Sequence, residues 1–182
     1  METDQSNPVI ESTSNSANQN IVTDDLSGAD QFLTFMLNGE EYGVDILRVQ
    51  EIKGWDAVTT IPNTPEYIRG VMNLRGTIVP IIDMRIRFSL DRMEYGPTTV
   101  VIVLRVEGET KSRIMGIVVD GVSDVYNLKQ SDIKSSPNFG SAVDTEFVNG
   151  ITTVDEKLVV ILDIDYMLNS SELNVLDSQV TN

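Results

Sequence analysis

The stretch Gly70–Asp83, which reads GVMNLRGTIVPIID, is the most informative part of this chain. Two apolar runs flank a polar turn that contains Arg75 and Gly76, so the pattern predicts a β-hairpin. Its turn carries one cation and no acid, base or nucleophile beside it. This arrangement favours a surface that holds a partner over a catalytic site.

A similar pattern returns about 80 residues later. Gly150–Asp163 reads GITTVDEKLVVILD and aligns with the first stretch without a gap, apolar on apolar at most positions. Gly43–Ile52 (GVDILRVQEI) matches Gly116–Val125 (GIVVDGVSDV) in the same order. Two ordered matches favour an internal duplication. We therefore predict two related halves of about five short strands, divided near residues 91–97, each closed into a small barrel that hides its edges.

The two ends of the chain differ from this β-rich middle. Residues 1–30 are polar with few apolar side chains, and they cannot bury enough surface to offset chain entropy, so we expect disorder. The folded part is expected to begin near Gln31 with a hairpin that turns at Asn38–Gly39. After residue 163 the apolar residues have helical spacing, which predicts a terminal helix packed on the barrels.

Composition excludes several classes of function. The 182 residues include no cysteine and no histidine, which removes disulfides, thiol chemistry, the commonest metal ligand and the commonest general base. The net charge of −15 argues against nucleic acid and against an anionic membrane surface. No apolar run is long enough to span a membrane. The N-terminus lacks the basic region followed by an apolar segment that would indicate a secretory signal.

The basic residues are confined to the middle of the chain. All 13 lie between Arg48 and Lys157, and the segment from Arg48 to Arg92 holds seven basic and five acidic residues. Two interpretations remain open: a mixed solvated surface, or a docking face for an acidic partner.

Four carboxylates stand at predicted strand ends: Asp83, Asp120, Asp163 and Asp165. A hydrolase with paired carboxylates is one interpretation. Aspartate after a strand or before glycine is more often a turn or cap residue. Glu51 and Arg75 are the more informative charges: they predict an ion pair that either is structural or frames a hydrophobic partner surface.

Further segments extend the hairpin signature over most of the chain. They are Glu40–Ile46, Val49–Ile52, Asn63–Pro65, Arg69–Gly76, Val79–Arg85 and Gly116–Val125. In order and spacing they closely resemble the CheW family of chemotaxis coupling proteins, and the resemblance covers about residues 31–176.

The resemblance implies a mainly β fold of two tandem, five-stranded SH3-like β-barrels with a shared core, a few short helices and a C-terminal helix. The expected boundaries are a first barrel at about 31–92, a second at about 98–162 and a terminal helix at about 163–176, with tails at 1–30 and 177–182. CheW proteins are not enzymes. They bridge the cytoplasmic tips of chemoreceptors to the histidine kinase CheA. The resemblance thus implies a non-enzymatic adaptor without cofactor or metal, located in the cytoplasm and recruited to membrane-associated receptor arrays.

Two sets of residues are carried over from the family by motif. The receptor-binding groove between the barrels would use Val49, Glu51, Ile52, Arg75, Val100 and Val122. A helical receptor tip suits aliphatic anchors plus one charge that fixes register. The alternative role of the aliphatic residues is core packing, and Val100 suits either role equally.

The kinase contact would use Ile61, Arg69 and Gly70. The regulatory domain of CheA itself resembles CheW, so this contact is expected to join barrel to barrel, and the same surfaces can assemble copies of the chain into rings. Three alternatives remain: a coupling module of a larger protein, a β-barrel binding module unrelated to chemotaxis, and the hydrolase above.

Overall fold

The computed structural model describes residues 27–135 and 145–169, which are mainly β-strand, as predicted. The strands are β1 (Ala29–Leu37), β2 (Glu40–Asp45), β3 (Val49–Gly54), β4 (Ile68–Leu74), β5 (Thr77–Asp83), β6 (Val100–Glu107), β7 (Ser112–Val119), β8 (Gly121–Lys129), β9 (Val148–Val154) and β10 (Lys157–Leu162). The short helical segments are η1 (Ile46–Arg48), α1 (Met84–Arg87), η2 (Gln130–Asp132), η3 (Thr145–Phe147) and α2 (Ile164–Leu168).

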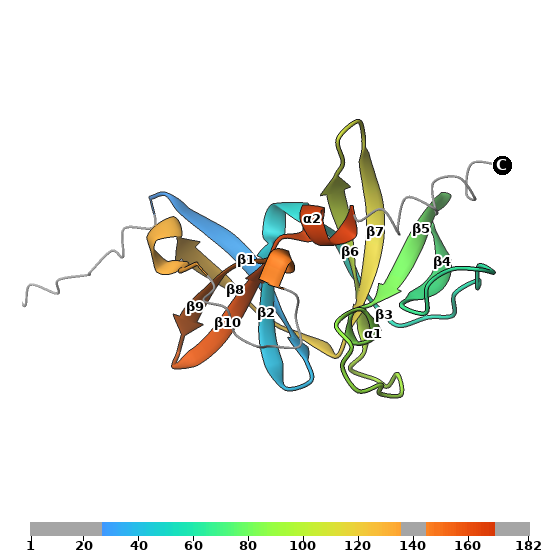
Figure 1. The fold of residues 1–182 in the computed structure, drawn as a ribbon, viewed down its shortest axis with the longest axis horizontal. Helices are drawn as coiled ribbons and strands as arrows, with labels where there is room; N and C mark the ends of the chain where they lie inside the picture. The colour runs from blue at the N-terminus through green and yellow to red at the C-terminus, as the bar shows by residue number, and fades with distance from the viewer. Residues whose placement is uncertain (1–26, 136–144, 170–182) are drawn as a thin grey trace, which may run out of the picture.

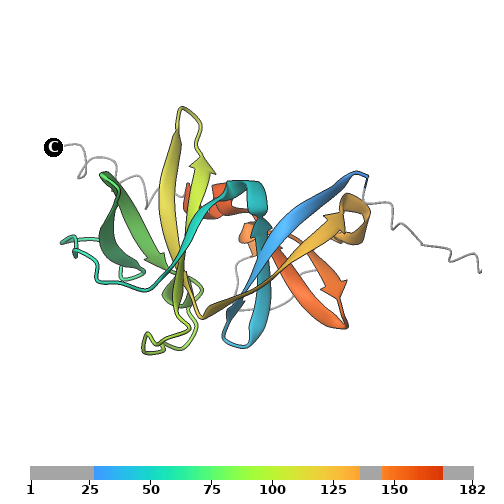
Figure 2. The same ribbon diagram turned by 180° about the vertical axis from the view of Figure 1, so that it is seen from behind.

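The strands form two five-stranded sheets that lie side by side (Figure 1). The middle of the chain forms one sheet in the order β3-β6-β7-β5-β4, which we call the middle sheet. The two ends form the other in the order β8-β1-β2-β10-β9, which we call the terminal sheet. The chain leaves the terminal sheet through η1, the first crossing, and returns at Asp120, the second crossing (Figure 2).

Strand pairing agrees with the predicted internal duplication, because β1–β5 correspond in order to β6–β10. Within each sheet the two copies meet twice, through a parallel pair (β10 beside β2, β5 beside β7) and through an antiparallel pair (β8 beside β1, β3 beside β6). An isolated bridge stands at the same place in each sheet, Thr59 with Val71 and Lys134 with Ile151. Each bridge ties the segment after one edge strand to the opposite edge strand, so both sheets curl toward closure.

The predicted division into one barrel at about 31–92 and a second at about 98–162 is wrong. Each sheet takes strands from both copies. Along the sequence, all strands of the middle sheet fall between β2 and β8 of the terminal sheet. The segment near 91–97 separates the two copies of the repeat but not the two sheets. Hairpin patterns are local, whereas the pairing of β2 with β10, from opposite ends of the chain, leaves no local signal.

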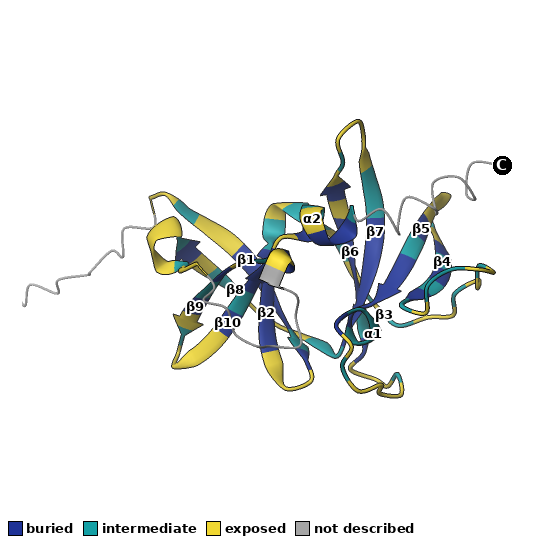
Figure 3. Cartoon of the chain, viewed as in Figure 1, coloured by how far each residue is buried: buried dark blue, intermediate teal, exposed yellow. Residues whose placement is uncertain are grey.

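The largest core lies between the two sheets and draws on both of them. Phe35 and Leu37 on β1 and Ile102 and Leu104 on β6 are fully buried in it. Because side chains alternate along a strand, other residues of these strands, such as Val103 on β6 and Phe32 on β1, fill smaller clusters inside each sheet. Figure 3 shows the second half of β7 in the dark blue of buried residues, whereas the hairpin ends are mostly yellow, the colour of exposed residues. This confirms the shared core that the resemblance implied.

The boundaries at the two ends differ slightly from the prediction. β1 begins at Ala29, two residues before the expected start at Gln31. At the other end Asp163 caps α2 by accepting a hydrogen bond from the backbone N–H of Tyr166 at 2.9 Å. The predicted tail residues 1–26 and 177–182, and the predicted helical residues 170–176, lie outside the described residues.

Candidate partner-binding surface

Arg75 lies at the tip of the β4–β5 hairpin, where the two-residue turn Arg75–Gly76 joins Leu74 to Thr77. Both turn residues have positive φ, 53° and 88°, which is the turn conformation that matches the twist of hairpin strands. The side-chain oxygen of Asn73 accepts a hydrogen bond from the Gly76 N–H at 2.8 Å. The turn therefore presents the Arg75 side chain to solvent, 86% exposed.

The predicted ion pair between Arg75 and Glu51 is present, with 3.6 Å between the guanidinium and a carboxylate oxygen. Glu51 lies on β3 and Arg75 follows β4, and these are the two edge strands of the middle sheet. Because the arginine is so exposed, this contact contributes at most about 1 kcal/mol of stability. Its main effect is to orient the arginine above β3.

Aliphatic side chains accompany this charge pair on the middle sheet. Ile52 on β3 is 43% exposed. Val49 on β3 and Val100, the first residue of β6, are partly buried against the large core. For Val100, where core and partner-facing roles were equally expected, the structure thus shows an intermediate position. Three partly exposed aliphatic residues therefore come from the neighbouring strands β3 and β6, and the outward cation comes from the hairpin at the opposite edge of the sheet.

Val122 lies apart from the other five predicted receptor residues, because it is on β8 in the terminal sheet. It follows the second crossing by two residues and is 37% exposed. The structure therefore distributes the predicted set over both sheets, with Val49, Glu51 and Ile52 just after the first crossing and Val122 just after the second.

Two exposed neighbours of Val122 were not among the residues predicted from the sequence. Asp124 and Val125 stand in the second copy at the positions of Glu51 and Ile52 in the first. Both are exposed, Val125 by 38%. The signal was available, because the predicted duplication already aligned these four residues.

The predicted kinase-binding residues gather at one end of the middle sheet. Ile61 packs partly buried against the large core, and the Arg69 guanidinium lies 5.7 Å from the Tyr95 ring centroid. Gly70 is buried with φ at 139°, and a Cβ there would lie 2.2 Å from the Thr59 carbonyl oxygen. The structure therefore gives Gly70 a role in closing the sheet that is independent of any partner.

The basic segment from Arg48 to Arg92 is largely neutralised by its own neighbours. Four of its arginines form ion pairs, Arg48 with Asp165, Arg75 with Glu51, Arg85 with Asp120 and Arg92 with Glu66. Arg87 lies between the rings of Tyr67 and Phe147, 4.9 and 4.8 Å from their centroids. These contacts favour the mixed surface over a uniformly cationic docking face.

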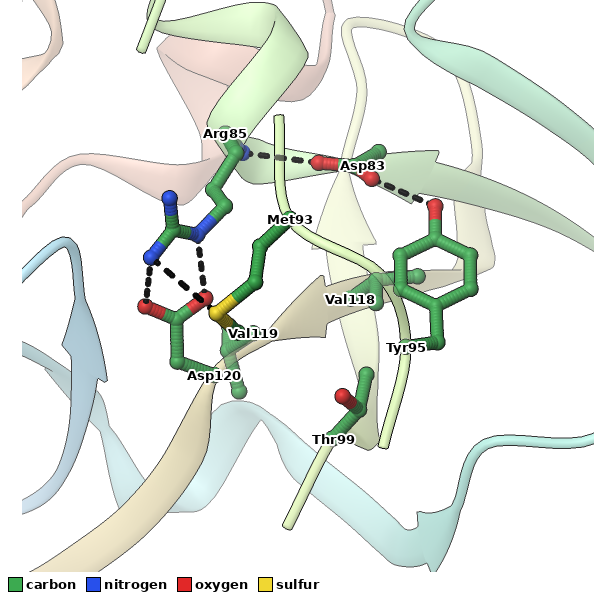
Figure 4. Close-up of a pocket in the computed structure, with 8 residues that line it drawn as sticks. All are labelled: Asp83, Arg85, Met93, Tyr95, Thr99, Val118, Val119 and Asp120. Carbon is green, nitrogen blue, oxygen red and sulfur yellow. Dashed lines mark hydrogen bonds and ion pairs between the residues drawn. The ribbon is translucent and has the colours of Figure 1, made fainter. Parts of the chain in front are cut away.

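A small pocket beside α1 contains a tight polar network (Figure 4). Arg85 donates two hydrogen bonds to Asp120, at 2.6 and 2.7 Å, and these bonds raise the pKa of Arg85. Asp83 accepts hydrogen bonds from the backbone N–H groups of Arg85 and Ile86 and from the Tyr95 hydroxyl. Burial, and then this bond to Asp83, raise the pKa of Tyr95.

The predicted strand-end aspartates serve structural purposes. Asp83 and Asp163 cap α1 and α2, and Asp120 binds Arg85 and accepts a hydrogen bond from the Asn38 backbone N–H at 2.8 Å. Asp83 and Asp120 do line the same pocket, but Arg85 stands between their carboxylates. These partners favour the turn and cap interpretation over paired-carboxylate hydrolysis.

Residues 27–135 and 145–169 contain neither of two other kinds of site. Within these ranges no three acidic side chains gather in a way that would hold a metal ion. No helix in the same ranges is long and apolar enough to cross a membrane.

Fold and surface together define a two-sheet β protein of the binding-module class. The family model described as the CheW-like domain matches residues 31–172. The chain is 47% identical over 148 residues to chemotaxis protein CheW of Klebsiella aerogenes, covering 81% of this chain and 87% of that protein. It is 32% identical over 146 residues to chemotaxis protein CheW of Rhizobium meliloti, covering 80% and 92%. The chain therefore belongs to the CheW-like family.

A solved structure gives the same result for the fold. The scaffolding protein TtCheW of Thermoanaerobacter tengcongensis matches with a TM-score of 0.71 and 31% identity, over 79% of this chain and 90% of that one. These relationships confirm the family resemblance seen in the sequence. They also confirm that the chain belongs among scaffolding proteins rather than enzymes.

Proposed function

We propose that this protein couples chemoreceptors, the methyl-accepting chemotaxis proteins, to the histidine kinase CheA. Its relatives are named chemotaxis protein CheW and scaffolding protein. The observation that carries the proposal is the outward Arg75, which pairs with Glu51, the residue before the exposed Ile52 on β3. An exposed cation and an exposed aliphatic side chain on the same sheet support a role in holding a protein partner.

The receptor contact uses Val49, Glu51, Ile52, Arg75, Val100 and Val122. A receptor tip is a helical hairpin, and such a partner is held by aliphatic anchors and oriented by one charge. Covering an exposed aliphatic side chain such as Ile52 is worth about 1 kcal/mol. Arg75 adds less affinity than orientation, because its charge is screened by solvent until the partner covers it.

The kinase contact uses the end of the middle sheet that carries Ile61, Arg69 and Gly70, and its partner is the regulatory domain of CheA. Neither contact alone needs to be strong. Linked contacts with receptors, kinase and further copies of this chain in rings raise the effective affinity and would recruit the protein to membrane-associated receptor arrays.

The first test is CheA autophosphorylation with receptor signalling fragments, with and without this protein. We expect the protein to raise kinase activity and to make it respond to receptor state. Arg75→Asp should still bind CheA but lose the response. Arg105→Asp is the matched control, because Arg105 is an exposed arginine of the same sheet that pairs with Glu107 at 3.3 Å.

A second pair of variants tests the aliphatic part of the surface. Ile52 and Ile78 are equally exposed, 43% each, on β3 and β5 of the middle sheet. Ile52→Ala should weaken binding of a receptor fragment several-fold, since one covered aliphatic side chain is lost, while Ile78→Ala should not. If the wild-type protein neither binds CheA nor changes its activity, it is a β binding module outside this pathway.

A further inference from the structure

Each crossing between the sheets is held by an arginine–aspartate pair. At the first crossing, Arg48 of η1 donates two hydrogen bonds to Asp165 of α2, at 2.7 and 3.3 Å. At the second crossing, Arg85 of α1 donates two to Asp120, at 2.6 and 2.7 Å. Planar, two-bond pairs of this kind fix geometry as well as charge.

The helical members of the two pairs occupy equivalent places in the duplicated chain. Asp83 caps α1 and Asp163 caps α2, and these caps end the two aligned stretches of the repeat. Arg85 and Asp165 are each the second residue of the helix that follows. The same position therefore carries a cation in the first copy and an anion in the second.

The crossings show the same reversal. The first crossing presents the cation Arg48, and the second presents the anion Asp120. Each helix thus bears the charge opposite to that of the crossing beside it. The two pairs have the same construction with opposite polarity.

This polarity distinguishes the observed connectivity from its simplest alternative. In the observed fold β3 lies beside β6 and β5 beside β7, while β8 lies beside β1 and β10 beside β2, so each copy completes the other's sheet. If each copy closed on itself, β3 would lie beside β1 and β5 beside β2, while β8 would lie beside β6 and β10 beside β7. The Arg85 of α1 would then meet Arg48, and the Asp165 of α2 would meet Asp120. Both contacts would be repulsive.

We infer that the opposite polarity of the Arg48–Asp165 and Arg85–Asp120 pairs determines which crossing each helix closes on, and so selects the exchanged connectivity of the two copies. In a repeat with identical copies, the charge pairs would be equally attractive in both closures. Reversing the signs of one pair makes the two closures differ, because the mismatched closure then brings like charges together. The pairs also precede the partner-facing strands β3 and β8, so the choice fixes where Val49 and Val122 lie.

Charge reversal gives a direct test of this inference. Exchanging the second pair, Arg85→Asp with Asp120→Arg, keeps an attractive pair but gives both crossings a cation and both helices an anion. Every closure then becomes attractive. Exchanging the first pair as well, Arg48→Asp with Asp165→Arg, restores opposite polarity with every sign inverted.

The absence of native cysteine allows the connectivity to be read with thiol-attached pyrene probes. Glu40→Cys with Lys157→Cys places probes at the adjacent starts of β2 and β10, where both residues are exposed. Glu40→Cys with Thr77→Cys places the second probe at the start of β5, which would lie beside β2 only in the alternative closure. Excimer fluorescence from the first probe pair reports the observed connectivity, and from the second pair it reports the alternative.

Each protein is unfolded in denaturant and refolded before the measurement. We expect excimer from only the first probe pair in the wild-type background and in the four-site variant, and from both probe pairs in the two-site variant. Excimer from the first pair alone in the two-site variant overturns the inference.

A neutral variant covers the case in which the charge-exchanged chains do not fold. Arg48→Gln and Asp165→Asn together with Arg85→Gln and Asp120→Asn remove both repulsive contacts that oppose the alternative closure. Excimer from the second probe pair then supports the inference, and its absence in a folded protein overturns it. These readouts use neither receptor nor kinase, so they are independent of the proposed adaptor function.

Discussion

The hairpins β4–β5 and β9–β10 are copies of one backbone with opposite charges at their tips. The first turns through Arg75 and Gly76 at φ 53° and 88°, and the second turns through Asp155 and Glu156 at φ 47° and 65°. Arg75 forms an ion pair with the carboxylate of Glu51, whereas both turn residues of the second hairpin, Asp155 and Glu156, are acidic. The difference shows that the duplication preserved the backbone of the hairpin, while the charges at its turn diverged.

The largest effect is expected where the two copies differ in backbone conformation. Gly70→Ala should destabilise the protein by at least about 3 kcal/mol, because its left-handed backbone and the close Thr59 carbonyl both oppose a side chain. Gly150 is its counterpart, where a Cβ would lie 2.4 Å from the Ile133 side chain and 2.8 Å from the Lys134 carbonyl oxygen, so the backbone contact is longer than at Gly70 and the left-handed φ is missing. Gly150→Ala should therefore cost less.

Urea denaturation of these variants measures the difference. Gly54→Ala is the control, because a Cβ at Gly54 meets no atom within 4 Å, and it should change stability by less than about 1 kcal/mol. Equal destabilisation by all three substitutions would contradict the assignment of Gly70 to sheet closure.

The two crossings should differ next. The Arg85 and Asp120 side chains are 12% and 17% exposed, against 27% and 30% for Arg48 and Asp165. Asp120→Asn should therefore cost about 2 kcal/mol and Asp165→Asn about 1 kcal/mol, since solvent compensates an unpaired charge better at the more exposed pair. Thermal unfolding of both variants at low and high salt checks the order, and a reversed order would contradict it.

The two hairpin turns should also differ in their effect on receptor binding. Arg75→Asp should weaken receptor-fragment binding about tenfold, which corresponds to about 1.4 kcal/mol. Asp155→Arg should leave receptor binding within about twofold, because the partner contact belongs to the first copy. Titration of labelled receptor fragment measures both, and equal losses would show that the two tips share the contact.

The smallest effect concerns a contact made by Asp83, the cap of the first copy. The Tyr95 hydroxyl binds Asp83, and the pKa of Tyr95 is raised. Because the folded state then holds its proton at a higher pH than the unfolded state, stability should fall as pH rises above about 10. Tyr95→Phe should reduce this alkaline loss by about 1 kcal/mol between pH 10 and 11. Unfolding midpoints across this range measure it, and identical alkaline slopes would contradict it.

The sequence predicted the local features well. The hairpin at Gly70–Asp83, its repeat and the Glu51–Arg75 pair all follow from short patterns of apolar residues, turn residues and charge. The nesting of the sheets could not be predicted in this way, because it depends on parallel pairs between distant strands. The Arg85–Asp120 pair was missed for the same reason, since Asp120 on its own resembles an ordinary turn residue.

The candidate surface was predicted in part. The motif identified the residues on β3 and the hairpin tip, and the structure shows the ion pair that orients them. The motif alone could not separate a partner-facing role of Gly70 from a structural one, because the crowding by Thr59 arises from a strand contact outside the motif. The receptor and kinase roles of the two residue sets remain predictions.

The nested arrangement of the sheets also has a consequence for the order of synthesis. The hairpin β1–β2 leaves the ribosome first, yet its neighbours β8 and β10 are translated after the whole middle sheet. Phe35 and Leu37 must therefore wait for strands made much later, which is the situation that exposes nascent chains to aggregation. A chain cut short near the second crossing would contain every strand of the middle sheet but would leave its first hairpin without a neighbour on either side.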